Sequence, residues 1–244
     1  MGLSLSPTAL AFKKRAADAG FALDDFQCNR FEIYRRLIKE WNQKIDITKI
    51  TEDREIDNKH FMDSLSLFRL MDRKKPYKLV DIGTGGGFPG IVLAILNPAL
   101  EMTLLDSLNK RVEFLKVVIK ELGLRKVWAV HGRAEEVFRQ KEYRDGFDVA
   151  VSRAVAPLPT LLEYCLPAVR VGGVFYAMKG PAAEEELAQS QKATQSLGGK
   201  LGRVDSFLWT EEQYQRTILE FQKVSPTPAR YPRGQGKPRK APLS

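Results

Sequence analysis

The segment that most limits the possible folds is a glycine-rich loop that follows a short apolar run. Residues 79–82 read Leu-Val-Asp-Ile, and residues 83–90 read Gly-Thr-Gly-Gly-Gly-Phe-Pro-Gly. Glycine lets a loop bend sharply and lets a ligand touch bare backbone, and a helix starting at the proline adds free N–H groups and a partial positive charge. A tight structural turn is the alternative. Between a predicted strand and a predicted helix, the loop favours a ligand site.

After residue 78, short apolar runs alternate with helical stretches. We predict strands at residues 78–82, 102–106, 127–131, 147–152 and 174–179, and helices at 89–96, 109–122, 134–140, 160–169 and 182–197. Such alternation is typical of a doubly wound α/β fold, in which helices cover both faces of a mostly parallel sheet. Two further apolar runs, 202–208 and 217–223, can pair as an antiparallel edge and bring the sheet to seven strands.

The ends of the chain differ from this α/β pattern. Helices are expected to begin after Ser6-Pro7 and after Asp24-Asp25, and a third helix is expected over residues 53–70. The second has an apolar side that starts at Phe26 and ends at Trp41. The last twenty residues are rich in Pro, Gly, Lys and Arg. We therefore divide the chain into an N-terminal helical extension (1–72), an α/β domain (73–224) and a basic tail (225–244).

Charge and composition narrow the function classes. Lys and Arg number 39 against 30 Asp and Glu, which gives a formal net charge of +9. A positive field favours a polyanionic partner such as nucleic acid, although a mildly basic protein without such a partner is the alternative. Two distant cysteines and two histidines argue against a disulfide framework and a zinc site. No apolar run reaches the roughly 20 residues of a membrane span, so we expect a cytoplasmic protein.

The glycine loop also indicates which nucleoside binds. A dinucleotide fingerprint requires glycine at position 88, where this chain has Phe88. An acid, Asp81, instead precedes a G-x-G-x-G run formed by Gly83, Gly85 and Gly87. This arrangement resembles the S-adenosylmethionine-binding loop of class I methyltransferases, in which the acid can meet the cationic part of the ligand.

The next two strand ends carry further candidates for the same ligand. Asp106 lies about 20 residues past the loop, a position suited to the ribose hydroxyls; a cap on the helix near Asn109 is its alternative role. Ala134 and Glu135 could frame the adenine, or could simply begin a helix with a favourable acid in its first turn.

The fourth strand end, Ser152 to Ala156, is expected to face the methyl acceptor. It reads Ser-Arg-Ala-Val-Ala and lacks the Asn/Asp-Pro-Pro-aromatic clamp common among enzymes that methylate exocyclic amines. Neither Cys28 nor Cys165 is placed to act as the nucleophile that methylation of a pyrimidine carbon needs. A ring nitrogen such as guanine N7 needs neither device, because its lone pair lies in the ring plane and it has no proton to lose.

A set of motifs in order along about 200 residues resembles the ribosomal RNA small subunit methyltransferase G family, also called glucose-inhibited division protein B. They are Trp41-Asn42 with Ile47-Thr48, His60 to Leu65, Asp81 to Gly90, Asp106 to Arg111, Gly132 to Glu135, Ser152 to Ala156, Gly172-Gly173 through Lys179-Gly180, and Tyr231-Pro232-Arg233. The resemblance implies a class I methyltransferase fold with a Rossmann-like sheet. It also implies N7-methylation of guanosine 527 in bacterial 16S ribosomal RNA, by direct in-line transfer from S-adenosylmethionine without a covalent intermediate.

Carried over to this chain, the resemblance implies specific contacts. The donor, which leaves as S-adenosylhomocysteine, would touch Gly83, Phe88, Ala134, Glu135 and Arg153, and residues 106–108, including Ser107 and Leu108, would meet its ribose and adenine. No metal is expected. Candidates for positioning the acceptor are Arg153 and Lys179, whereas His60 is expected to be structural.

Basic residues at both ends are candidates for RNA contact. They are Arg36, Lys44, Arg230, Arg233, Lys237, Arg239 and Lys240. Lys and Arg neutralise phosphates, but they also populate any solvated helix face. The five in the tail have no local acid as a partner, and we expect the tail to lie beside the acceptor site. The expected partner is 16S ribosomal RNA or the small ribosomal subunit, bound by a monomer.

Three other functions fit part of this pattern. A non-catalytic RNA-binding protein could retain the fold, and measured donor binding would separate it from an enzyme. A nicotinamide-dependent oxidoreductase is disfavoured by Phe88. A methyltransferase for small molecules would not require the basic tail.

Overall fold

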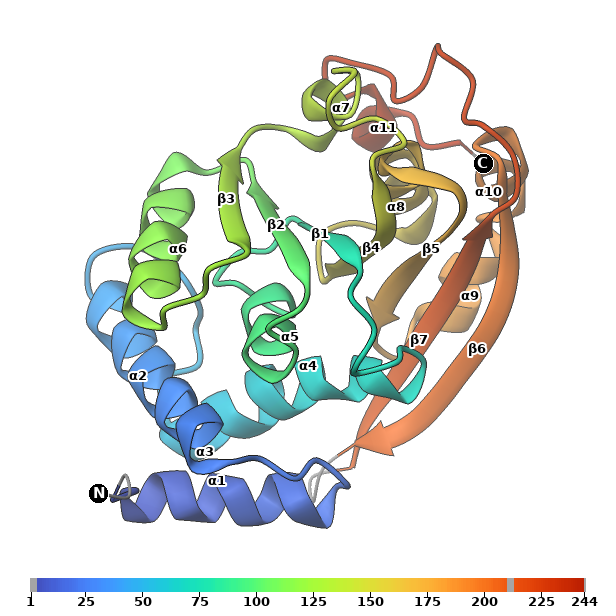
Figure 1. Ribbon diagram of the computed structural model, residues 1–244. Coiled ribbons are helices and arrows are strands. Elements are labelled where there is room, and N and C mark those ends of the chain that lie inside the picture. Colours follow the sequence, from blue (N-terminus) through green and yellow to red (C-terminus); the bar gives the residue numbers. More distant parts are fainter. Residues whose placement is uncertain (1–3, 210–212, 244) are drawn as a thin grey trace.

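A seven-stranded sheet organises the chain (Figure 1). The computed structural model describes residues 4–209 and 213–243. The strands are β1 (Lys78–Ile82), β2 (Glu101–Asp106), β3 (Val127–His131), β4 (Phe147–Arg153), β5 (Val169–Lys179), β6 (Gly199–Trp209) and β7 (Tyr214–Lys223). Their order across the sheet is β3-β2-β1-β4-β5-β7-β6. The first five run parallel, and β7 pairs antiparallel with β5 and β6, which confirms the predicted architecture.

The register of the parallel strands brings their carboxyl ends to one edge. Asp81 of β1 is level with Leu104 of β2 and Val151 of β4, and Asp106 is level with His131 of β3. Parallel strands in a doubly wound sheet reverse their order around the first strand, and ligands bind at that point. The glycine loop that follows β1 therefore lies where the sheet topology expects a ligand.

Helices cover both faces of the sheet. They are α5 (Gly90–Leu96), α6 (Asn109–Glu121), α7 (Ala134–Val137), α8 (Leu158–Cys165), α9 (Ala183–Ala188), α10 (Gln191–Ser196) and α11 (Lys237–Lys240). The core on one face contains α5 and α6 with the N-terminal helices, and the core on the other face contains α8 and α10.

Three predicted helices have different bounds in the structure. The helix expected over 134–140 is shorter, because α7 stops at Val137. The helix expected over 160–169 was wrong at its end: a 3₁₀ turn with Pro167 follows α8, and Val169 pairs with Phe147 as the first residue of β5. The helix expected over 182–197 is two helices, because the Ser190 hydroxyl donates to the Leu187 carbonyl and competes with the helical pattern.

The N-terminal residues form helices as predicted. Ser6 caps α1 (Pro7–Asp18), and Asp24 forms a capping box at the start of α2 (Asp25–Asn42). Helical turns then continue through α3 (Asp53–Ile56), a π-helical segment (Asp57–Met62), α4 (Asp63–Leu65) and a 3₁₀ turn (Ser66–Arg69). Phe26 was wrongly placed on the apolar side of α2, since its side chain is 71% exposed.

The N-terminal helices and the sheet share one hydrophobic core. The Phe31 and Phe61 rings lie 5.0 Å apart, and Tyr34 stacks on Phe61 at 5.3 Å. Tyr34 also lies 5.5 Å from Phe88 of the glycine loop, and its hydroxyl donates a 2.5 Å hydrogen bond to the Gly86 carbonyl. The helical extension therefore supports the loop directly, and burial of these rings stabilises both parts together.

Candidate functional site

The loop after β1 has an unusual backbone that a buried acid holds in place. Gly83, Gly85 and Gly87 have φ values of 69°, 59° and 99°, which favour glycine. The Asp81 carboxylate accepts hydrogen bonds through Oδ2 from the Thr84 hydroxyl at 2.6 Å and from the Gly90 N–H at 2.8 Å. Asp81 therefore ties the start of the loop to the start of α5.

Asp81 itself is fully buried, and burial raises its pKa to about 6. Its second oxygen, Oδ1, is buried without a hydrogen-bond partner among the described residues. An unsatisfied buried acceptor is costly. The structure places Asp81 behind the loop, where Oδ2 holds the loop backbone and Oδ1 is sealed from solvent.

A cavity of about 290 Å³ opens at the carboxyl ends of β1, β2 and β3, and we call it the donor cavity. It is lined by Ile82, Gly83, Leu105, Asp106, Ser107, Gly132, Arg133, Ala134, Glu135, Val155, Ala156, Tyr164, Gly236, Arg239 and Lys240. Five predicted donor contacts therefore meet in one place: Gly83, Asp106, Ser107, Ala134 and Glu135. The remaining predicted contacts, Asp81, Gly85, Gly87, Phe88, Leu108 and Arg153, lie outside its lining.

The two acids of the donor cavity suit a nucleoside. The Asp106 carboxylate accepts from the Gly85 N–H and the Leu108 N–H, both at 2.9 Å, so it joins the glycine loop to β2. It does not cap α6, whose first turn receives no side-chain bond, and the alternative role for Asp106 was wrong. Glu135 is 4% exposed, and its nearest cation, Arg133, is 3.9 Å away. Both carboxylates retain lone pairs for hydroxyl or amino groups.

Phe88 of the glycine loop and Arg153 of β4 contact the helical extension at His60 and Asp63. The His60 ring stacks on Phe88 at 4.4 Å, and the Arg153 guanidinium lies 5.2 Å from the centre of the same ring. Arg153 donates to Asp63 Oδ2 at 2.6 Å, to the Lys59 carbonyl at 2.8 Å and to His60 Nδ1 at 3.2 Å. These contacts hold Arg153 at the end of β4.

His60 is a neutral, hydrogen-bonded residue. Burial lowers its pKa to about 3, and the neighbouring Arg153 cation acts in the same direction. Since Arg153 can only donate, Nδ1 accepts from it, and the proton lies on Nε2, 2.8 Å from the Thr48 hydroxyl. The expected structural role of His60 agrees with these contacts.

The depressed pKa of His60 predicts acid sensitivity. In the unfolded chain the imidazole takes a proton near pH 6.5, but the folded protein resists this down to about pH 3, so stability is lost as pH falls through this window. We expect the advantage of wild type over His60→Gln in unfolding free energy to shrink by about 2 kcal/mol between pH 6.5 and pH 5. Urea unfolding at each pH measures it. A constant difference would contradict the prediction, and His131→Gln controls for loss of an exposed imidazole.

A second cavity of about 680 Å³ adjoins the first, and we call it the acceptor cavity. Its lining includes His60, Asp63, Arg153, Lys179, Glu186, Tyr214 and Arg216. Val155 and Ala156, which follow β4, line both cavities. Ala154 beside them has φ of 56°, a conformation that non-glycine residues adopt rarely and mostly at functional sites. Residues 154–156, which we call the β4 loop, therefore form a wall common to the two cavities.

The acceptor cavity includes charged residues that were not among the predicted site residues. Asp63 is buried and binds Arg153 through one oxygen and Arg216 of β7 through the other, at 2.6 and 2.7 Å. Glu186 of α9 pairs with Lys179 at 2.6 Å. Only the matched His60–Leu65 motif contained one of these acids, and neither Arg216 nor Glu186 lies in a motif. Asp63 binds partners 90 and 153 residues away, which no local pattern could reveal, and Glu186, although only seven residues from Lys179, lies outside every motif.

The basic tail packs across α8 and reaches the donor cavity (Figure 1). Arg144 donates to the Tyr231 and Thr227 carbonyls at 2.7 Å, and the Thr160 hydroxyl donates to the Pro238 carbonyl at 2.9 Å. Arg239 and Lys240 line the donor cavity, whereas no tail residue lines the acceptor cavity. The tail therefore lines the donor cavity, which adjoins the acceptor cavity beside which it was expected.

The other basic candidates for RNA contact differ in whether their charged groups already have a partner within the protein. Arg233 makes a two-pronged contact with the buried Glu163, so its guanidinium holds the tail, and a contact of Arg233 with RNA stays a prediction. Arg36 pairs with the exposed Glu40. Lys44 lies over Trp41 and Arg230 over Tyr231, which leaves their charges open to a partner. Lys237 begins α11.

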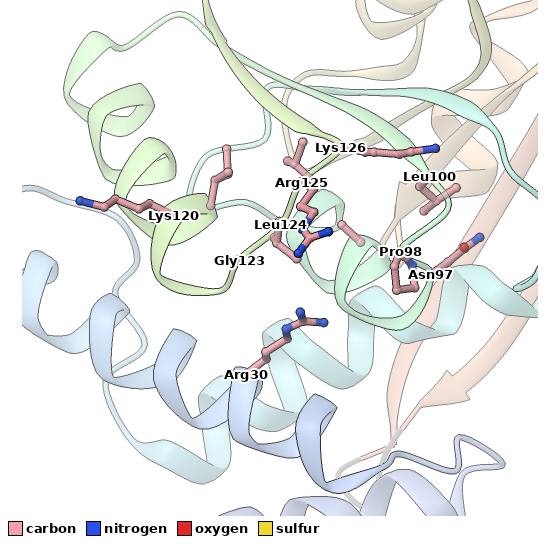
Figure 2. Close-up of a pocket in the computed structure, with 12 residues that line it drawn as sticks. Arg30, Asn97, Pro98, Leu100, Lys120, Gly123, Leu124, Arg125 and Lys126 are labelled. Atoms are coloured by element: carbon pink, nitrogen blue, oxygen red, sulfur yellow. The ribbon is translucent and has the colours of Figure 1, made fainter.

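A further cavity, of about 730 Å³, lies at the opposite edge of the sheet, where β2 and β3 begin. Figure 2 shows Arg30 of α2 and Arg125 turning toward each other there, while Lys120 and Lys126 point to its margins. These cations lie near the C-terminal ends of α5 and α6, where the helix dipole favours positive charge. This cavity is separate from the glycine loop and plays no part in the site above.

Sequence comparisons identify the family. The profile described as rRNA small subunit methyltransferase G matches residues 27–217. The chain is 46% identical to ribosomal RNA small subunit methyltransferase G of Clostridium botulinum (strain Eklund 17B / Type B) over 94% of its own length and 96% of that protein. It is 47% identical to the protein of the same name from Acetivibrio thermocellus, over 94% of each chain.

The chain belongs to the rRNA small subunit methyltransferase G family. Solved structures add the fold. M. jannaschii TYW2 in complex with AdoMet matches 74% of this chain and 81% of its own with a TM-score of 0.55 and 15% identity. TrmN from Thermus thermophilus matches 66% and 48% with a TM-score of 0.52 and 16% identity. The family member described here therefore has the class I methyltransferase fold, as predicted. Among its described residues, no helix is long and apolar enough to cross a membrane.

Proposed function

We propose that this protein transfers a methyl group from S-adenosylmethionine to N7 of guanosine 527 in bacterial 16S ribosomal RNA. The observation that carries the proposal is the meeting of two cavities at Val155 and Ala156. The donor cavity offers the glycine backbone, Asp106 and Glu135 to a nucleoside. The acceptor cavity lies next to it at the end of β4 and is the space that we assign to the base.

The chemistry needs alignment more than acid–base groups. When bound, S-adenosylmethionine supplies an activated methyl group on a sulfonium. The N7 lone pair forms the new bond to the methyl carbon, the old carbon–sulfur bond breaks, and its electron pair stays on sulfur. No proton leaves the base. The titratable groups of the acceptor cavity are accordingly held by partners: Asp63 by two arginines, Lys179 by Glu186 and His60 by Arg153. Such a site acts by positioning and electrostatics.

The proposal assigns roles to the parts of the chain. The donor is held by the glycine loop with Asp81 behind it, and by Asp106, Ser107, Ala134 and Glu135. Arg153 and Lys179 position the acceptor. Residues 1–72 support the loop, residues 73–224 form the methyltransferase domain, and residues 225–244 close the donor cavity. Phosphates are contacted by Lys44, Arg230, Lys237, Arg239 and Lys240, whose charges remain open, and by Arg36, whose pair with Glu40 is exposed to solvent. The enzyme acts as a monomer in the cytoplasm on the RNA or the small subunit.

The decisive experiment incubates the protein with small ribosomal subunits and radiolabelled S-adenosylmethionine, followed by nuclease mapping. We expect one labelled nucleotide, guanosine 527 methylated at N7. Subunits already methylated there are the control and should accept no label. Label on an adenine amine or a pyrimidine carbon would overturn the assignment. Calorimetric titration with S-adenosylmethionine separates an enzyme from a non-catalytic RNA-binding protein, which would show no affinity for the donor.

A further inference from the structure

An ion pair in the acceptor cavity has hydrogen-bonding capacity that the protein does not use. Lys179 ends β5, and its side chain is 8% exposed. Its ammonium donates to the Ala156 carbonyl at 2.8 Å and to Glu186 Oε2 at 2.6 Å. Glu186 of α9 also accepts from the Leu158 N–H through the same oxygen, at 2.6 Å. Contacts on two sides therefore fix the pair in position beside the β4 loop.

A count of donors and acceptors shows which hydrogen bonds Lys179 and Glu186 can still make. An ammonium has three N–H donors, and Lys179 uses two of them. A carboxylate has two oxygens, and Glu186 uses only Oε2, which leaves Oε1 without a partner among the described residues. The Glu186 side chain is 25% exposed and lines the acceptor cavity together with Lys179. One donor and one acceptor are thus presented side by side to the same cavity.

This pattern is complementary to one edge of guanine. That edge carries the O6 acceptor next to the N1–H and 2-amino donors. Adenine reverses the pattern, with an amino donor at C6 and a lone pair at N1, which would face the carboxylate. The O6 atom is attached to C6 and projects from the base between N1 and N7. A partner that binds O6, N1–H and the 2-amino group therefore leaves N7 free. A negative carboxylate near the base also stabilises the positive charge that methylation places on the base.

We propose that Lys179 and Glu186 select the acceptor base as guanine. The Lys179 ammonium donates to O6, and Glu186 Oε1 accepts from N1–H and the 2-amino group. Both are positioning residues, and the inference rests on the proposed function. Hydrogen bonds to charged groups in a desolvated site are stronger than those between neutral groups, so loss of one is expected to cost about 10-fold to 100-fold in kcat/KM.

The test compares subunits that carry guanosine or inosine at the acceptor position, since inosine lacks only the 2-amino group. For the wild-type chain we expect kcat/KM to be about 10-fold lower or more with inosine. In Glu186→Ala, which removes the acceptor, the ratio of guanosine to inosine should fall close to 1. Glu184→Ala removes an exposed carboxylate from the same helix and should keep the wild-type ratio.

The ratio separates recognition from structural damage. A variant that only disturbs the fold lowers activity on both substrates alike, and an unchanged ratio in Glu186→Ala would overturn the inference. Lys179→Met provides a second arm: we expect lower kcat/KM on both bases with the preference for guanosine retained, because Glu186 still reads the 2-amino group. Failure of the proposed function itself would look different, since the wild-type chain would then label no guanosine at all.

Discussion

Replacing Gly83 with alanine is expected to weaken binding of S-adenosylmethionine by about 100-fold. Gly83 lines the donor cavity with φ of 69°, and an added Cβ would lie 2.4 Å from a methyl carbon of Val155. Val155 forms part of the wall shared by both cavities, so its displacement deforms the donor cavity and misaligns the acceptor. Calorimetric titration with the donor measures the loss of affinity.

Gly85→Ala is the matched control in the same loop. Its φ of 59° imposes similar backbone strain, but a Cβ there would meet nothing within 4 Å. Both variants should lose about 1 kcal/mol of stability from the left-handed backbone, and only Gly83→Ala should lose most of its affinity. Equal affinity losses in the two variants would show that strain alone, without the contact to Val155, governs donor binding.

Replacing Asp63 with alanine is expected to lower the free energy of unfolding by about 3 kcal/mol and to abolish most methyl transfer. Asp63 is 3% exposed and neutralises Arg153 of β4 and Arg216 of β7 at once. Its removal leaves two partly buried guanidinium groups without their carboxylate. Arg153 would also lose the contact that holds it at the acceptor cavity. Urea unfolding and the labelling assay measure the two effects.

The exposed pair of Lys13 and Asp25 provides the comparison. Lys13 Nζ lies 2.6 Å from Asp25 Oδ1, the same distance as between Arg153 and Asp63 Oδ2. Both side chains of the Lys13–Asp25 pair, however, are more than a third exposed. Exposed ion pairs contribute little because water and salt screen them. Asp25→Ala should therefore change the unfolding free energy by less than about 1 kcal/mol. A similar cost in both variants would contradict the importance given to the burial of Asp63.

The sheet was predictable because its strands are short apolar runs with clear boundaries. Strands β1 and β3 have the predicted bounds, 78–82 and 127–131. The errors came where local helix preference met a tertiary constraint. Residues near Pro167 look helical, but Val169 belongs to the sheet because it pairs with Phe147, at the start of the neighbouring strand β4. Phe26 has helical spacing with the buried side of α2, yet it is 71% exposed because none of the described elements covers it.

The donor cavity was predicted better than the acceptor cavity. Gly83, Asp106, Ala134 and Glu135 each follow a strand, and parallel strands bring such positions together. The acceptor cavity depends on side chains from elements far apart in the chain. Asp63 comes from the helical extension and Arg216 from the last strand of the sheet, and their ion pair spans 153 residues. No spacing rule joins such positions.

Short-range sequence patterns were enough to predict the strand–loop–helix unit around residues 79–90, the parallel sheet and the family. Hydrophobic periodicity and glycine placement act over a few residues and can be read without the tertiary structure. Tertiary structure alone decided that Asp81 supports the loop from behind, that tail residues line the donor cavity and that Asp63 joins two distant arginines. The physical reason is burial: a carboxylate or guanidinium takes its role from the partners that surround it once water is removed.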